Sequence, residues 1–336
     1  TLSREVRFPH SIGLLYSTFT AFLGFEVNEG EYKVMGMAPY GRPRYLDQVR
    51  KLVHQDGDAS FRLDLDYFSF HYSTQRMYSD RFERLFGPPR DPRRAFGRPD
   101  GRGGEMPLPA DDQRYADIAA SVQLVTEETL LAMARALQRE TGLTRLCMAG
   151  GVALNSVANG RILREPPFEE LYVHPAAGDS GGAVGAAFYG HHVLLGQPRR
   201  FVMEHAYWGE EHSSGDIEAF LRSANVRYEL VEDPERRVER VAAALAGGKV
   251  VGWFQGRFEW GPRALGNRSI LADPRRAEMK EVVNTKIKFR EPYRPFAPSV
   301  LAERAAEYFE LAVAPGAYPA RFMLLVVKVR EDRRAE

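Results

Sequence analysis

The stretch LCMAGGVALN at positions 146–155, followed by LYVHPAAGDSGG at positions 171–182, carries the pattern that decides the fold. Each stretch opens with a short apolar run, at Leu146 and at Leu171, which has the length of a buried strand. Each run leads through a glycine-rich turn into a segment of helical character, toward Ile162 in the first case and over residues 183–195 in the second. Two strand–turn–helix units in tandem predict an α/β fold.

The glycines of both turns stand where a strand gives way to a helix. Backbone N–H groups at such a point bind phosphate together with the helix dipole. One such turn is explained by tight-turn geometry alone, whereas two in tandem point to a nucleotide. The spacing matches neither the Walker loop nor the dinucleotide G-x-G-x-x-G pattern.

A second unusual stretch is GRFEWGPRALGNRSIL at positions 256–271, which follows a strand-like apolar run over residues 250–254. Residues 251–300 contain ten Lys and Arg against five Asp and Glu, a charge of +5, whereas the whole chain carries +1. A local excess on a neutral chain indicates an anion site, because Arg grips phosphate or carboxylate in a planar, bidentate manner. The alternative is a solvated basic face. Arg263 and Arg268 stand among Gly, Pro, Leu and Ile, which favours the site.

Composition bounds the remaining possibilities. The chain has 336 residues, enough for about two domains, with 44% apolar and 27% charged residues. It contains no apolar run as long as a membrane helix, and its near-zero net charge argues against binding nucleic acid. The single cysteine, Cys147, favours a reducing, cytoplasmic setting. The first residue, Thr1, is not Met and begins no signal peptide, and we expect a chain cut at both ends.

The other elements follow from periodicity and capping. Helices are predicted from Ser11 as N-cap, over residues 115–140 with Gly142 as the stop, over residues 216–224, and from Asp233 onward. Residues 87–104 are rich in Gly and Pro and predict an exposed loop, and residues 198–216 predict a linker between two domains.

Several of these stretches together resemble the O-carbamoyltransferases of nodulation-factor and antibiotic biosynthesis (the NodU/CmcH family). The resemblance rests on EYKVMG at 31–36, the two glycine turns, the stretch 256–271, and IKFREPYRPFAP at 287–298. It implies part of an actin-like ATPase domain over residues 1–203, followed by part of a YrdC-like α/β domain over residues 204–336. Both domains would be incomplete, the first at its start and the second at its end.

The resemblance also implies an activity, ATP-dependent O-carbamoyl transfer in two steps. The YrdC-like domain forms carbamoyl adenylate from carbamoyl phosphate and ATP, and the actin-like domain transfers the carbamoyl group to a hydroxyl of a small-molecule acceptor. The resemblance assigns the contacts to phosphate and carbamoyl groups to Arg263, Lys288 and Arg294, with Arg268 and Ser269 as further candidates. The nucleotide contacts fall to Lys33, Glu31, Gly150, Gly151, Asn155 and Gly181. By itself, a lysine in this setting is more often a surface residue whose stem lies on apolar neighbours.

Asp179 has two interpretations. An Asp before Ser-Gly-Gly is commonly a cap or an Asx-turn. By resemblance it is a metal ligand, completed by two histidines of a His-x-x-x-His motif, and the metal expected is iron(II). One carboxylate and two imidazoles would also suit zinc or manganese, and magnesium could accompany ATP. The eight histidines of this sequence contain no such motif.

Two other functions stay open. One is a different actin-like nucleotide-binding protein, an ATPase or a sugar kinase. The arginine-rich GPRALG segment at 261–266 argues against this alternative. The other is a non-catalytic module that keeps the fold and a nucleotide, which the missing histidine motif would favour.

Overall fold

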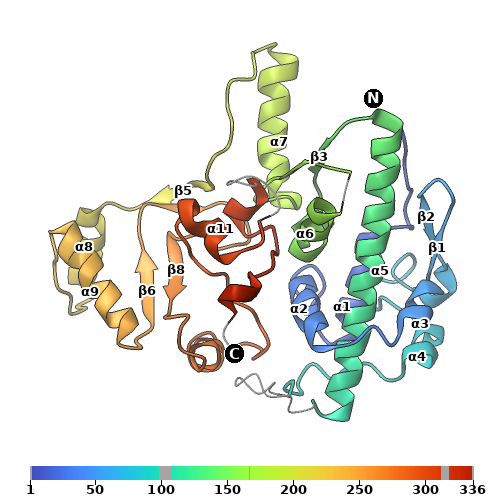
Figure 1. Cartoon of the computed structure of the whole chain (residues 1–336), viewed down its shortest axis with the longest axis horizontal. Coiled ribbons are helices and arrows are strands. Elements are labelled where there is room, and N and C mark those ends of the chain that lie inside the picture. Colours follow the sequence, from blue (N-terminus) through green and yellow to red (C-terminus); the bar gives the residue numbers. More distant parts are fainter. Residues whose placement is uncertain (1, 98–107, 166, 312–317, 335–336) are drawn as a thin grey trace.

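The computed structural model describes residues 2–97, 108–165, 167–311 and 318–334, and over these ranges the chain is mixed α/β, as predicted (Figure 1). The α-helices there are α1 Ile12–Phe22, α2 Glu31–Met37, α3 Leu46–Arg50, α4 Asp80–Phe86, α5 Ala110–Thr141, α6 Ser156–Arg164, α7 Gly182–Phe188, α8 Ser214–Ser223, α9 Pro234–Ala246, α10 Met279–Glu281 and α11 Ala305–Tyr308. The strands are β1 Val53–Gln55, β2 Phe61–Leu63, β3 Arg145–Met148, β4 Glu170–Val173, β5 Tyr207–Glu211, β6 Val251–Phe254, β7 Arg257–Glu259 and β8 Arg268–Leu271.

The first part of the chain packs α1 to α4 and the β1–β2 hairpin around the long helix α5. Helix α1 begins where the sequence predicted, because the Ser11 hydroxyl accepts a hydrogen bond from the Leu14 N–H at 3.2 Å. Helix α5 ends at Gly142, whose φ of +67° is the left-handed conformation that glycine adopts most readily. The buried faces of these helices and the hairpin form one apolar core.

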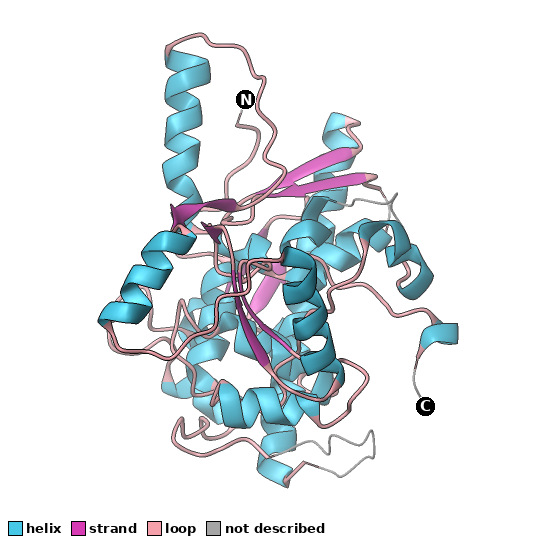
Figure 2. Ribbon diagram, turned by 90° about the vertical axis from the view of Figure 1, so that its left-hand side faces the viewer, coloured by secondary structure: helices cyan, strands magenta, loops and turns pink. Residues whose placement is uncertain are grey.

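The predicted strand–turn–helix units are confirmed. Strands β3 and β4 pair in parallel, with Arg145 opposite Glu170 and Met148 opposite Val173, and α6 makes the crossover between them. The turn after β3 is a 3₁₀ turn, Gly151–Leu154, and the turn after β4 is Asp179–Gly181, which leads into α7. A second apolar core lies beneath this unit. Helix α7 continues into a π-helical turn, Tyr189–Leu194, and stands clear of the body in both views (Figures 1 and 2).

The later part of the chain contains two antiparallel pairs, β5 with β7 and β6 with β8. Helices α8 and α9 lie at the far end of the long axis from α5 and bury none of their residues (Figure 1). Asp233 caps α9 with Pro234 at its first turn, as predicted.

Two expectations about loops are wrong in part. The stretch 198–216 contains β5, which pairs with β7, so it is not a plain linker. Two residues of β5 are partly buried and three are exposed, and a strand of this kind leaves no alternating apolar pattern in the sequence. Residues 87–97 carry no helix or strand, but Arg90 and Phe96 are buried there. Phe96 packs edge-on against Tyr293, with 5.0 Å between the ring centroids, and the Arg90 guanidinium donates to the carbonyl of Leu23 at 3.4 Å. Residues 98–104 of the predicted loop lie outside the described residues.

Tyr293 ties the later part of the chain to the earlier one. Its side chain is almost fully buried within the core of α1 to α5, whose other buried residues all lie earlier than residue 126 in the sequence. The ring lies 6.1 Å from that of Tyr40, and the Tyr40 hydroxyl accepts a 2.7 Å hydrogen bond from the Lys280 ammonium. Segment 280–295 is therefore held against α2 and the turn that follows it.

Candidate anion-binding site

The loop between β7 and β8 is shaped by one carboxylate. Glu259 Oε1 accepts hydrogen bonds from the backbone N–H groups of Leu265, Asn267 and Arg268 at 2.8 to 3.1 Å. Burial by itself would raise the pKa of Glu259, but these backbone donors outweigh it and hold the pKa below its usual value. Glu259 thereby fixes the loop that carries Arg263, a role that the sequence analysis did not assign.

Arg263 is a largely buried guanidinium with few partners. Its terminal nitrogen donates to the backbone carbonyl of Leu154 at 3.1 Å, at the end of the first glycine turn. Its Nε atom is buried and has no hydrogen-bond partner among the described residues. Burial lowers the pKa of Arg263, and the positive charge of Arg294 lowers it further. A buried cation beside another cation is costly unless an anion joins them.

Arg294 stands at the centre of a group of cations, of which Arg290 is partly buried and Lys288 is exposed. Burial lowers the pKa of Lys288, as do the charges of Arg290 and Arg294, and the pKa of Arg290 falls for the same reasons. Together with Lys33 these side chains form what we call the cation cluster, made of Lys33, Arg263, Lys288, Arg290 and Arg294. It contains the three residues to which the sequence analysis assigned the main phosphate and carbamoyl contacts.

Lys33 joins the cluster through Glu291, the carboxylate between it and Arg294. The Lys33 ammonium lies 2.9 Å from Glu291, and Arg294 lies 3.5 Å from the same side chain. Burial would raise the pKa of Glu291, but the hydrogen bond from Lys33 and both positive charges hold it below its usual value. One carboxylate among five cations leaves the cluster with a clear positive excess. The Arg294 guanidinium also stacks on the Tyr32 ring at 4.1 Å.

The first glycine turn lies against this cluster through the Arg263–Leu154 contact. Gly150 has a φ of +95°, a conformation that favours glycine, and a side chain at Gly150 or Gly151 would meet nothing within 4 Å. The Gly150 N–H is used within the fold, since it donates to the carbonyl of Ala177 at 2.8 Å. The turn therefore presents an open surface beside the cations.

Gly181 serves the packing of the second turn. A Cβ built on it would lie 2.2 Å from the carbonyl oxygen of Ala176, which only glycine avoids. Gly261 in the β7–β8 loop makes a similar approach to the carbonyl of Pro175, at 2.8 Å, with a φ of +121°. The corner at Pro175 and Ala176 thus touches both the second turn and the arginine-bearing loop.

Other predicted residues have structural partners. The side-chain oxygen of Asn155 caps α6 through the Ala158 N–H at 3.1 Å, and its amide exchanges hydrogen bonds with Gln123, which also accepts from the Tyr16 hydroxyl. Glu31 accepts from Ser17 at 2.7 Å. The nucleotide contacts of both stay predictions.

Arg268 and Ser269 are likewise engaged with their own loop. The Arg268 guanidinium donates to the carbonyls of Gln255 and Gly256 and stacks on the Phe254 ring at 3.5 Å. The Ser269 hydroxyl accepts from the Gly266 N–H at 3.0 Å. Their contact with an anion also stays a prediction, and the structure shows them supporting the β6–β8 pair.

Asp179 is exposed at the start of the second turn. Within the described ranges, no group of three or more His, Cys, Asp or Glu side chains could hold a metal ion. Its ligand role stays a prediction, since the residues described around it do not supply a ligand set.

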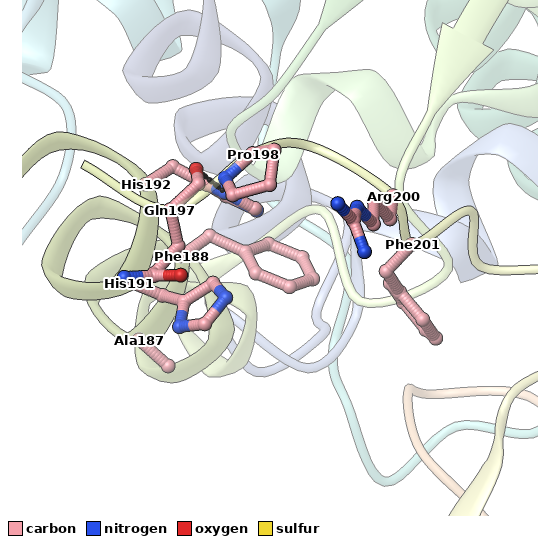
Figure 3. A pocket seen from close by; sticks show the side chains of 8 residues that line it. All are labelled: Ala187, Phe188, His191, His192, Gln197, Pro198, Arg200 and Phe201. Atoms are coloured by element: carbon pink, nitrogen blue, oxygen red, sulfur yellow. Dashed lines mark hydrogen bonds between the residues drawn. The ribbon is translucent and has the colours of Figure 1, made fainter. Parts of the chain in front are cut away.

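A hollow of about 680 Å³ lies away from the cluster, between the π-helical turn after α7 and the segment that returns from it (Figure 3). Phe188, His191, His192 and Phe201 are among its lining residues, and His192 Nδ1 lies 2.9 Å from the carbonyl oxygen of Gln197. None of the residues assigned to a site by the sequence analysis lines it.

Fold and site together define a mixed α/β protein in which a cluster of cations lies where the later part of the chain meets the earlier one. Residues 1–188 match the family described as the carbamoyltransferase N-terminus, and residues 242–336 match the carbamoyltransferase C-terminus. The chain belongs to the carbamoyltransferase family, which confirms the resemblance found in its motifs.

The chain is also similar to individual proteins, over nearly all of its residues or over part of them. An uncharacterised protein of Synechocystis is 48% identical over 98% of this chain and 51% of its own length. Nodulation protein NolO of Bradyrhizobium diazoefficiens is 39% identical over 99% of this chain and 56% of its own. The 3'-hydroxymethylcephem-O-carbamoyltransferase of Streptomyces clavuligerus is 35% identical over 55% of this chain and 34% of its own.

The chain spans about half the length of the curated relatives that it matches over nearly all of its residues. None of the helices in the described part of the chain combines the length and apolar character needed to cross a membrane.

Proposed function

We propose that this chain is part of an ATP-dependent O-carbamoyltransferase. The enzyme would use water to release phosphate from carbamoyl phosphate, and the resulting carbamate would attack the α-phosphate of ATP to give carbamoyl adenylate and pyrophosphate. It would then transfer the carbamoyl group to a hydroxyl of a small-molecule acceptor, with AMP as the leaving group. In this proposal residues 1–203 belong to an actin-like transfer domain and residues 204–336 to a YrdC-like, adenylate-forming domain. Family membership and the carbamoyltransferase named among the relatives support the reaction class.

The observation that carries the proposal is Arg263, a largely buried cation beside Arg294 with no carboxylate partner among the described residues. Carbamoyl phosphate and ATP are both polyanions, and their approach to one another is opposed by charge repulsion. Preorganised cations in a water-poor site lower that repulsion, which is the largest contribution a protein makes to phosphoryl and acyl activation.

The roles then follow from position. Arg263 and Arg294 would hold phosphate oxygens through planar donor pairs, and Lys288 would add a mobile point charge. Lys33 would exchange its partner Glu291 for a ligand oxygen. The open surface at Gly150 and Gly151 would receive the nucleotide. Arg268, Ser269 and Asn155 would keep the loop and the turn in shape, and Asp179 stays a candidate ligand for iron(II).

The test is exchange of labelled pyrophosphate into ATP that depends on carbamoyl phosphate, measured in the full-length gene product. Lys288→Ala should abolish the exchange, because the α-phosphate and pyrophosphate lose a cation. Lys286→Ala is the matched control, since Lys286 is an exposed neighbour two residues away and lies outside the cluster.

Pyrophosphate exchange that persists in the Lys288→Ala variant would contradict the proposed role of the cation cluster in adenylate formation. ATP binding with no exchange under any condition would contradict the carbamoyltransferase proposal. That result would favour an actin-like ATPase or kinase, or a non-catalytic nucleotide-binding module.

A further inference from the structure

Phe289 lies between two cations of the cluster, Lys288 and Arg290, and its side chain is 83% exposed. Its φ is +48°, in the left-handed region that a bulky L-residue rarely adopts. An exposed apolar ring gains nothing from packing, and a left-handed Phe costs free energy. Two unfavourable features at one position, beside a candidate binding site, call for a functional explanation.

The backbone on both sides of Phe289 is firmly held. The Lys288 N–H donates to the carbonyl of Val283 and the Arg290 N–H to that of Asn284, each at 2.9 Å. The Asn284 side chain is fully buried and accepts from Arg290 Nε at 2.7 Å, while its amide donates to the carbonyl of Arg294 at 3.0 Å. The ring is therefore presented to solvent by an ordered loop.

The ring also differs from its aromatic neighbours in the cluster. Tyr32 is covered by the Arg294 guanidinium, and Phe296 by that of Arg290 at 4.7 Å. No ring or cation contact is recorded for Phe289 within the described ranges, and both faces of the ring are open to a planar ligand.

We propose that Phe289 is a stacking platform for the aromatic base of the nucleotide whose phosphates the cation cluster holds. An aromatic ring beside a group of Arg and Lys residues is the combination that binds a base and its phosphates together, and stacking accepts any base because each has a π-face. This proposal rests on the proposed function, since it requires a nucleotide at the cluster.

The experiment measures, by calorimetry on the full-length gene product, the binding of ATP and of inorganic tripolyphosphate, which has the phosphates without the base. Phe289→Leu keeps an apolar side chain and removes the π-face. It should weaken ATP binding roughly five- to a hundredfold, as expected for one lost base–aromatic stack. Tripolyphosphate binding should change by less than about twofold, and Phe289→Trp should bind ATP at least as well as the unaltered chain.

Phe220→Leu is the matched control, because Phe220 is an exposed Phe on α8 and should leave both ligands unaffected. Equal weakening of ATP and tripolyphosphate by Phe289→Leu would overturn stacking, since the base would then play no part. ATP binding that needs Lys288 but ignores Phe289→Leu would also overturn it, while leaving the proposed function intact. If the unaltered full-length protein binds neither ligand, the proposed function fails first and the stacking proposal fails with it.

Discussion

Arg263 and Arg268 are the same residue type five positions apart, yet their environments differ. The terminal nitrogens of Arg268 donate to backbone carbonyls, and its guanidinium stacks on the Phe254 and Phe258 rings at 3.5 and 3.9 Å, although its Nε, like that of Arg263, has no hydrogen-bond partner among the described residues. Arg263 has one carbonyl and a neighbouring positive charge. For a single arginine, the partners it lacks therefore decide whether it can bind an added anion.

This contrast gives a paired prediction. Arg263→Gln should weaken tripolyphosphate binding about tenfold or more, because a charge-assisted contact is lost, and should leave the free energy of unfolding within about 1 kcal/mol. Arg268→Gln should do the opposite, costing about 1–2 kcal/mol of stability with little effect on binding. Calorimetry and urea unfolding of both variants measure the two quantities, and an exchange of the two patterns would contradict the assignment.

Glu259 gives the site a pH dependence. Because its pKa is lower in the folded chain than its ordinary value of 4.5, its contribution to stability is complete above that value and is lost as the pH falls below it. Glu259→Gln should therefore cost about 1–2 kcal/mol near pH 7, and the difference from the unaltered chain should shrink below about pH 4.5.

The measurement is urea unfolding of both proteins between pH 7 and the lowest pH at which they fold. Glu211→Gln serves as the control, since the exposed pair of Glu211 with Arg257 at 3.4 Å should contribute little. A difference for Glu259→Gln that stays constant across this range would show that its charge does not hold the loop.

At the scale of the element, helix α6 depends on Asn155 for its start. Asn155→Ala removes the N-cap and leaves the buried amide of Gln123 without one partner, so it should destabilise the chain by about 2–3 kcal/mol. Ser213→Ala on α8 removes an exposed cap and should cost about 1 kcal/mol. Thermal or urea unfolding gives both values, and equal costs would mean that the Gln123 contact adds nothing.

The whole molecule is joined by Tyr293, whose ring lies in the core of α1 to α5 although its sequence neighbours belong to the later part of the chain. Tyr293→Ala should cost about 3–5 kcal/mol through the cavity it leaves, and should weaken anion binding because Glu291 and Arg294 lose their position. Denaturant unfolding and tripolyphosphate titration test both effects.

Tyr293→Phe is the matched control for that variant. The Tyr293 hydroxyl is buried with no hydrogen-bond partner in the part of the chain that the structure describes, and burial raises the pKa of this group well above its usual value. Removing the hydroxyl should therefore be neutral or stabilising. A loss as large as that of the alanine variant would point to a hydrogen bond made by the hydroxyl.

Much of the fold could be predicted because its signals are local. Ser11, Asp233 and Gly142 mark helix ends by hydrogen bonds and dihedral angles that need only nearby residues. The strands around the two glycine turns carry short apolar runs bounded by glycine. Strand β5 was not predicted, because its residues are at most partly buried and show no alternation of apolar and polar side chains.

The sequence by itself determined the α/β units, the glycine turns, the basic character of residues 251–300 and the family, since these depend on spacing and local charge. Only the tertiary structure decided which cations meet. It brought Lys33 to Arg294 through Glu291, placed Arg263 at Leu154, and occupied Arg268 and Asn155 with structural contacts. The physical reason is that burial and charge neighbours depend on contacts between residues distant in sequence, which no local pattern records.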